Sequence, residues 1–177
     1  MRFTEEHEQF RKSVRAVIES EINPYVDEWE AAGIFPAHEL FPNLAKVGMF
    51  GLEYDPEFGG QGADHTFTVV LGEELGATAD CEGVPMAIDV QASMSTPALA
   101  KFGSDELKRT YLAPAMSGEM VTSVAVSEPD AGSDVAGIKT RAVRDGDDWV
   151  INGTKMWITS GTQADWICLL ARTSDEG

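Results

Sequence analysis

Apolar side chains near the N-terminus recur every three or four residues, which is the spacing of one helix face. Phe10, Val14 and Ile18 follow this spacing, and Thr4 ahead of them is a suitable N-cap because its hydroxyl can accept a backbone N–H. Pro24 should end or kink this helix, since the residue before a proline avoids the helical conformation. The same reasoning predicts further helices over residues 26–32, 37–47, 66–75 and 84–101, and one that starts after residue 104.

Residues with capping chemistry stand beside several of these segments. Asp64 and Ser104 can cap the helices that follow them, because their side-chain oxygens can accept the first free backbone N–H groups. Gly33 can close the helix before it, because glycine tolerates the left-handed conformation that often ends a helix. The helix boundaries are therefore expected near these three residues.

From Met120 onward the pattern changes from helical spacing to alternation, which is typical of strands. Asp145–Asp148 should form one turn between strands. Asn152-Gly153 should form a second, because an Asn-Gly pair suits the positive φ angles of a tight hairpin. Strands are expected over residues 120–127, 138–144, 149–151, 155–159 and 166–171.

The change of pattern places a domain boundary near Gly118. We expect an all-helical domain over residues 1–118 and the first part of a β domain over residues 119–177. The fold class is accordingly α+β, and a hydrophobic content of 43% is enough to form a core.

The charge balance narrows the possible partners. Thirty acidic and thirteen basic residues give a net charge of −17, so nucleic acid is a poor partner. No apolar run approaches the ~18–20 residues of a membrane span, and charged residues near the start argue against a secretory signal. Cys81 and Cys168 share no metal-binding spacing, the histidines form no cluster, and free thiols fit a reducing compartment. We therefore assign no metal.

A strand of small residues leads into a polar turn. Val124 and Val126 share one face of this strand, and Ser127 belongs to the other. The small side chains of the strand would let a ligand approach its backbone. In the turn that follows, Gly132 offers backbone freedom and Ser133 offers an N–H and a hydroxyl, which are groups that bind phosphate. An ordinary sheet core followed by a polar loop would show the same residues. The strand and the turn therefore indicate a cofactor site only when they are taken together.

A second segment offers a flat ring and a hydroxyl. Trp157 and Thr159 are two positions apart, so on a strand they would lie side by side on one face. Taken alone, a tryptophan in a strand is more often part of a core or an interface. With the preceding turn, the pattern indicates a site for a large flat cofactor that carries a pyrophosphate.

These segments resemble a known family. Ala125–Gly137 is similar to the signature of the acyl-CoA dehydrogenases, and Met156–Gly161 is similar to their second flavin-contacting segment. The resemblance extends to Phe58–Gly62, Phe102–Leu107 and Tyr111–Pro114, and it covers essentially the whole chain. Several motifs in the same order make it strong.

The resemblance implies a fold, a cofactor and a reaction. Such enzymes have a helical domain, a β-barrel-like middle domain and a second helical domain that carries the catalytic glutamate. They bind FAD, a carboxylate removes the α proton of an acyl-CoA, the β hydrogen passes to the flavin as hydride, and an electron-transferring flavoprotein reoxidises the flavin. Carried over, these roles make the cofactor-binding residues Val124, Val126, Ser127, Gly132, Ser133, Trp157, Ile158 and Thr159.

Three of these residues receive specific roles from the resemblance. Ser133 would contact the flavin pyrophosphate and also lie beside the bound thioester of the substrate. Trp157 would shield one face of the flavin ring, and the Thr159 hydroxyl would bond the ring nitrogen that receives hydride. The full-length protein is expected to be a homo-oligomer, a dimer or a tetramer, in the cytoplasm or the mitochondrial matrix.

Several alternatives remain. The chain reaches Gly177 inside the expected middle domain, so it reads as an N-terminal portion with the general base outside it, and this portion alone should be inactive. An acyl-CoA oxidase-like flavin oxidase of the same fold is one alternative, and a non-catalytic module that binds flavin or a full-length partner is another. The apolar stripe in the 84–101 helix favours a packed helix face over an acyl tunnel; it comprises Met86, Val90, Met94 and Leu99.

Overall fold

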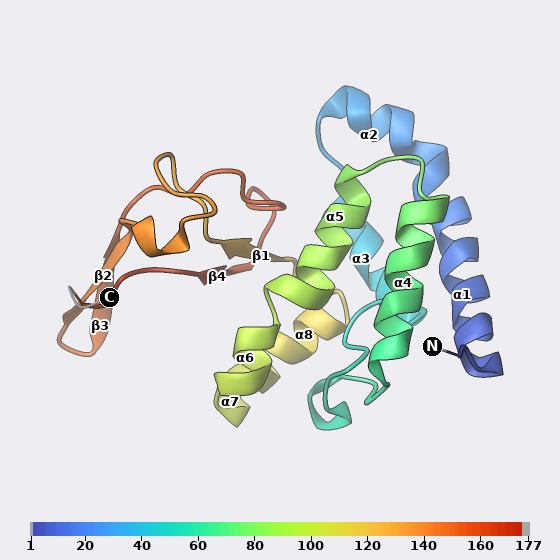
Figure 1. Ribbon diagram of the computed structural model, residues 1–177, viewed down its shortest axis with the longest axis horizontal. Helices are drawn as coiled ribbons and strands as arrows, with labels where there is room; N and C mark the ends of the chain where they lie inside the picture. The colour runs from blue at the N-terminus through green and yellow to red at the C-terminus, as the bar shows by residue number, and fades with distance from the viewer. Residues whose placement is uncertain (1, 175–177) are drawn as a thin grey trace.

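The computed structural model describes residues 2–174, which form a group of helices followed by a smaller region of strands and loops (Figure 1). This order confirms the expected α+β fold class, with the helical domain first. Within the described residues, no helix is long and apolar enough to cross a membrane. The α-helices are α1 (Glu5–Val17), α2 (Val26–Ala32), α3 (Ala37–Lys46), α4 (His65–Thr78), α5 (Gly83–Asp89), α6 (Pro97–Phe102), α7 (Asp105–Leu107) and α8 (Ala113–Met116).

The expected caps are confirmed. The Thr4 side chain accepts the His7 backbone N–H, and the His7 ring nitrogen Nδ1 accepts the Thr4 N–H at 2.9 Å, so each residue satisfies the other at the start of α1. Asp64 and Ser104 cap α4 and α7 through their side chains. Gly33 ends α2 with a φ of 68°. These boundaries follow from local chemistry, which explains why the sequence predicts them.

The predicted helix over residues 84–101 is wrong as a single helix. It consists of α5, a π-helical turn η4 (Val90–Met94) and α6. Similar π-helical turns occur in η1 (Ile18–Ile22) and η5 (Lys108–Leu112). Each lies two or three residues before a proline, which lacks the N–H that regular helical bonding requires. The widened turns end with backbone bonds from Asn23 to Ile18, Ser95 to Val90 and Ala113 to Lys108.

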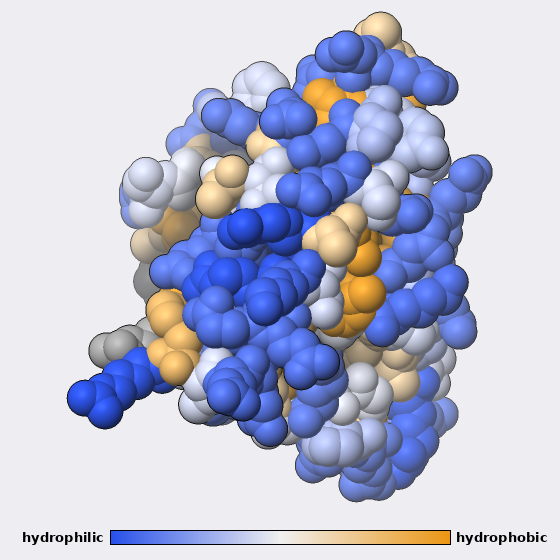
Figure 2. Space-filling view, turned by 90° about the vertical axis from the view of Figure 1, so that its right-hand side faces the viewer, coloured by the Kyte–Doolittle hydropathy of each residue, from blue (hydrophilic) through white to orange (hydrophobic). Residues whose placement is uncertain are grey.

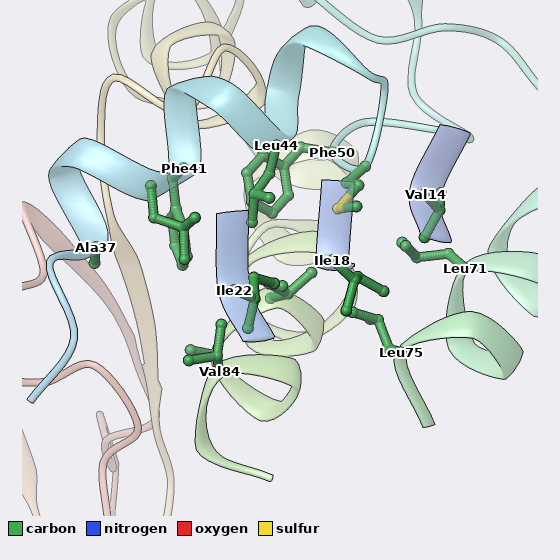
Figure 3. Close-up of a cluster of buried hydrophobic side chains, with 14 of the residues drawn as sticks. Val14, Ile18, Ile22, Ala37, Phe41, Leu44, Phe50, Leu71, Leu75 and Val84 are labelled. Atoms are coloured by element: carbon green, nitrogen blue, oxygen red, sulfur yellow. The ribbon is translucent and has the colours of Figure 1, made fainter. Parts of the chain in front are cut away.

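The helical core is built around α1 and its continuation η1. Val14, Ile18 and Ile22 are fully buried along one face, as the sequence spacing predicts. Figure 3 shows them between side chains of α3 and α4, with Val84 of α5 below. Each such side chain contributes roughly 1.5–3 kcal/mol by leaving water. The side chains that surround them include Ala37, Phe41, Leu44, Phe50, Leu71 and Leu75.

A buried carboxylate joins α1 to α4, and the sequence pattern does not reveal it. Glu74 is 1% exposed and accepts hydrogen bonds from Arg11 at 2.8 Å and from Arg15 at 2.8 and 3.1 Å. Burial disfavours the ionised carboxylate, but the bonds from Arg15 and Arg11 outweigh it and lower the pKa of Glu74. The outer face of α1 is hydrophilic for most of its length (Figure 2).

Two pairs of strands form the β region, namely β1 (Thr122–Ala125) with β4 (Trp166–Leu169), and β2 (Arg141–Asp145) with β3 (Asp148–Asn152). The β1–β4 pair is parallel, and the β2–β3 pair is an antiparallel hairpin. Its turn lies at the expected place, where Gly146 has a φ of 63°. The short 3-10 turns are η2 (Asn23–Tyr25), η3 (Pro56–Phe58) and η6 (Val135–Gly137).

The second predicted hairpin is wrong. Residues 155–159 form no strand, and β3 pairs with β2 instead of with them. Gly153 has a different purpose: a Cβ there would lie 2.3 Å from the Thr140 Oγ1 atom and 2.6 Å from its Cα atom. Glycine is required because two backbone segments approach closely, not because a tight turn follows.

A single buried amide links the helices to β1. Gln91 of η4 donates hydrogen bonds to the carbonyl oxygens of Ala115 and Met120, at 2.9 and 2.7 Å. Its carbonyl oxygen accepts from the backbone N–H and the hydroxyl of Thr122, at 2.8 and 3.0 Å. All of its hydrogen-bonding capacity is used, so the position of β1 is tied to the helix. We retain the proposed domain boundary near Gly118, just before this strand.

Candidate cofactor site

The strand β1 has one buried face and one more open face. Ser123 and Ala125 are buried, whereas Val124 and Val126 are half-buried. The predicted alternation holds over these four residues, although Thr122, on the same face as the valines, is fully buried. The open face carries the valines that the sequence placed at the candidate site.

The structure brings the strand and the tryptophan segment together. The Met156 N–H donates to the carbonyl oxygen of Ser127 at 3.0 Å, and the Ser123 hydroxyl donates to the carbonyl oxygen of Thr159 at 2.7 Å. Segments 123–127 and 156–159 thus lie side by side although about thirty residues separate them. The sequence predicted that both segments belong to one cofactor site, and the structure places them in contact.

Trp157 and Thr159 do not share one face of a pleated strand, so that prediction is wrong. Trp157 has a φ of 59° and Ser160 a φ of 60°, and this left-handed backbone turns the chain around Thr159. The Trp157 side chain is left 85% exposed. Thr159 and Ser160 border a pocket of about 250 Å³ whose other walls are mostly from α2, α5 and the loop after α2.

Two hydroxyl groups in this segment have no partner. The Ser160 hydroxyl is buried and makes no hydrogen bond. The Thr159 hydroxyl also has none among residues 2–174, whereas the Thr159 carbonyl is bonded to Ser123 of β1. Strained backbone and unused polar groups are concentrated where binding sites often occur. Ile158, between the two strained residues, is half-buried.

The polar turn after β1 is closed by its own backbone. The Glu128 N–H donates to the Ala131 carbonyl at 2.7 Å, and the Ala131 N–H returns a bond to Glu128 at 3.2 Å. Gly132 and Ser133 follow and are exposed. Gly132 does not have a positive φ, so the expected need for glycine's backbone freedom is wrong. A Cβ at Gly132 would meet no atom within 4 Å, so the space beside this turn is open.

The acidic residue that begins the turn is surrounded by hydrogen-bond donors. Glu128 accepts the backbone N–H groups of Lys139 at 2.6 Å and Thr140 at 2.9 Å, and its Oε1 atom also accepts from the Lys155 Nζ at 2.9 Å. Burial disfavours ionisation, but hydrogen bonds from Thr140, Lys155 and Lys139 hold the pKa of Glu128 at about 2. The carboxylate is therefore ionised, and its charge is paired with the Lys155 ammonium.

These features suit a flat ligand with an anionic part. The exposed indole of Trp157 offers a flat apolar surface, and the turn at Gly132 and Ser133 is open and exposed. The unpaired Thr159 hydroxyl can donate to a ring atom. FAD has these properties, so the residues present are compatible with it. No hydrogen bond joins Ser133 to Trp157 among the described residues.

Comparison with models of protein families identifies the family to which the chain belongs. Residues 4–119 match the N-terminal domain of acyl-CoA dehydrogenases, and residues 123–177 match the middle domain. The chain belongs to the acyl-CoA dehydrogenase family. The two matched ranges adjoin near the proposed boundary, and they contain all the candidate residues of this acyl-CoA dehydrogenase family member.

Three relatives are each about one-third identical in sequence to this chain. The long-chain specific acyl-CoA dehydrogenase of rat mitochondria is 36% identical over 174 residues, covering 98% of this chain and 40% of that protein. A 3-(aryl)acrylate reductase of Clostridium sporogenes is 37% identical, covering 98% of this chain and 45% of that protein. A glutaryl-CoA dehydrogenase of Mycobacterium smegmatis, solved in complex with FADH2, has a TM-score of 0.90 at 32% identity, covering 98% of this chain and 44% of that one. The chain thus spans less than half the length of these relatives.

Sequence reasoning missed the polar residues that hold the site together. Lys155 and Glu128 form a pair whose side chains are only 9% and 5% exposed. Lysine and glutamate are usually at the surface, so no local pattern distinguishes a buried pair. The position of Lys155 just before the tryptophan segment was the one available signal, and a lysine alone is too common to be used.

Proposed function

We propose that the full-length protein is an FAD-dependent acyl-CoA dehydrogenase that oxidises the α,β-bond of an acyl-CoA. The observation that carries this proposal is the hydrogen-bonded contact between segments 123–127 and 156–159, beside the exposed Trp157. Membership of the family and a relative solved with FADH2 support it. The substrate chain length is left open.

Each candidate residue has a proposed task. Ser133, with Gly132, would bind the pyrophosphate through the open turn and would also lie beside the substrate thioester. Trp157 would cover one face of the ring and exclude water from it. Thr159 would donate its unpaired hydroxyl to the ring. The backbone of Val124, Val126, Ser127 and Ile158 would complete the contacts with the ring.

The chemistry that FAD supplies when bound is acceptance of a hydride equivalent. The general base that takes the α proton is proposed to be a carboxylate outside residues 1–177. We further propose that an electron-transferring flavoprotein accepts the electrons, that the protein is a dimer or tetramer, and that it works in the cytoplasm or the mitochondrial matrix. No nucleic acid or membrane is included among its partners.

Flavin binding by the full-length protein tests the proposal. FAD content and affinity should be measured for the wild type, Ser133→Ala and Trp157→Ala, with Trp149→Ala on the β2–β3 hairpin as the matched control. Loss of a hydrogen bond at Ser133 that bound FAD shields from water should cost ~1–3 kcal/mol of binding free energy. Trp149 is 50% exposed and lies outside the site, so its variant should bind FAD normally. Unchanged affinity and flavin spectra in both site variants would reject the assignment.

A reaction in the opposite direction is the second candidate. It is favoured by the Clostridium sporogenes relative, whose name describes reduction of an acrylate. Reduced enzyme should be mixed anaerobically with an aryl acrylate or its thioester, and oxidised enzyme with a saturated acyl-CoA. Faster reoxidation by the acrylate than reduction by the acyl-CoA would favour the reductase. Rapid reoxidation by oxygen would instead indicate an oxidase.

A further inference from the structure

One carboxylate is connected to three separate parts of the β region. The backbone of Glu128 closes the turn that precedes Ser133. Its side chain accepts the N–H groups of Lys139 and Thr140, which lie after the turn, and the ammonium of Lys155, which lies after β3. A displacement of Glu128 would therefore move the turn relative to both other segments.

Lys155 makes the remaining connection. Its Nζ atom donates to the Val126 carbonyl at 2.7 Å and to the Glu128 carboxylate at 2.9 Å. The next residue, Met156, bonds the Ser127 carbonyl, and Trp157 follows directly. Lys155 is thus the point at which the segment that carries the indole is attached to the strand that leads into the polar turn.

The surroundings leave this attachment little freedom. Gly153, two residues before Lys155, lies against the backbone of Thr140, where not even a Cβ would fit. The chain at Gly153 therefore cannot move closer to Thr140. Both partners of the ion pair are buried, so water screens their attraction weakly.

We infer that the Lys155–Glu128 ion pair is a positioning element that sets the spacing between the two halves of the FAD site, the turn over residues 128–134 and the segment over residues 156–159. This inference rests on the proposed function. Neither side chain is proposed to touch the cofactor. A cofactor that spans both halves binds well only when the halves are already at the correct separation, because ordering them on binding would reduce the affinity.

The test compares the ion pairs of two buried carboxylates, Glu128 and Glu74, in the full-length protein. Lys155→Met removes the ammonium of one pair, and Glu74→Gln weakens the other, which joins α1 to α4 away from the β region (Figure 1). For each apoprotein, the thermal midpoint, the FAD dissociation constant and the visible circular dichroism of the saturated flavin should be measured. Lys155→Gln, which retains a donor for the Val126 carbonyl, replaces Lys155→Met if the latter does not fold.

The expected result separates stability from positioning. Substitution at Lys155 should raise the FAD dissociation constant about tenfold or more and change the circular dichroism of the bound flavin. Glu74→Gln should lower the thermal midpoint yet leave the dissociation constant within about twofold and the flavin signal unchanged. Equal weakening by both variants, or unchanged binding and signal at Lys155, overturns the inference. Failure of the wild type to bind FAD overturns the proposed function instead.

Discussion

The Ser123 hydroxyl holds the carbonyl oxygen of Thr159 at 2.7 Å, so β1 fixes the backbone of Thr159 and leaves its hydroxyl without a partner. This arrangement allows the side chain to act on a ligand while the backbone stays in place. It also means that removing the hydroxyl should disturb the fold very little.

For the full-length protein, Thr159→Ala should slow flavin reduction more than it weakens substrate binding. A donor at the ring stabilises charge that grows during reduction, so its loss affects the reaction more than the ground state. Removing one such donor costs up to ~10²–10³ in rate where the charge is well developed. Anaerobic stopped-flow reduction by an acyl-CoA measures the effect, with Ser123→Ala as a variant that removes the backbone contact instead. A normal rate with flavin fully bound would exclude this role for the hydroxyl.

Gly153→Ala should lower the free energy of unfolding by about 1–3 kcal/mol or more, because the added Cβ meets the Thr140 backbone and cannot be relieved by a rotamer change. Gly76→Ala in α4 is the matched control, since a Cβ there meets nothing within 4 Å. Alanine at that helical position should stabilise by about 0.5–1 kcal/mol. Urea unfolding of both variants provides the comparison, and equal stabilities would contradict the close approach.

Acidification should weaken the fold through Glu128. The pKa of this carboxyl is lowered from 4.5 to about 2 in the folded chain, chiefly by hydrogen bonds that outweigh its burial. A depressed carboxyl pKa stabilises the fold above the unfolded value, and that stabilisation is lost as the pH falls from about 5 toward 2. Glu74 shifts in the same direction and adds to the loss.

The contribution of Glu128 can be isolated by Glu128→Gln. Its unfolding free energy should depend less steeply on pH than that of the wild type over this range, although it starts lower at neutral pH. Denaturant unfolding at several pH values gives both curves. Parallel curves would show that the ionisation of Glu128 does not contribute.

The local features of the fold could be predicted from the sequence, and the non-local ones could not. Thr4, Asp64 and Ser104 were found as caps because capping depends on neighbours a few residues away. Trp157 and Ser160 have left-handed backbone on either side of Thr159, whose carbonyl is bonded to Ser123 of β1, so the alternation in the sequence predicted a strand where none exists. The alternation of apolar and polar residues along the sequence carries no information on contacts between distant residues.

The candidate site shows the same division. Its chemical groups, from Ser133 to Thr159, could be named because their residue types and order resemble a family. The connections that hold them, Lys155 with Glu128 and Gln91 with Thr122, involve partners 27 and 31 residues apart. Buried polar pairs of this kind follow from the packed structure and leave no periodic trace in the sequence.

Residues 1–177 alone should show no dehydrogenase activity. The proposed general base lies outside this range, and the β2–β3 hairpin exposes Val143, Trp149 and Ile151. Anaerobic mixing of the isolated portion with FAD and an acyl-CoA should leave the flavin oxidised. Stoichiometric bleaching would mean that a base is present within these residues.

The parallel pairing of β1 with β4 has a consequence for the order of folding. Thr122 pairs with Trp166, so the whole β2–β3 hairpin lies within the loop that this pairing must close. Closing such a loop carries an entropy cost that helices and hairpins avoid, and contacts of this range form late in folding. The individual helices and the β2–β3 hairpin can form from neighbouring residues. The surface between residues 123–127 and 156–159 needs the closure of a long loop, so we expect it to form after them.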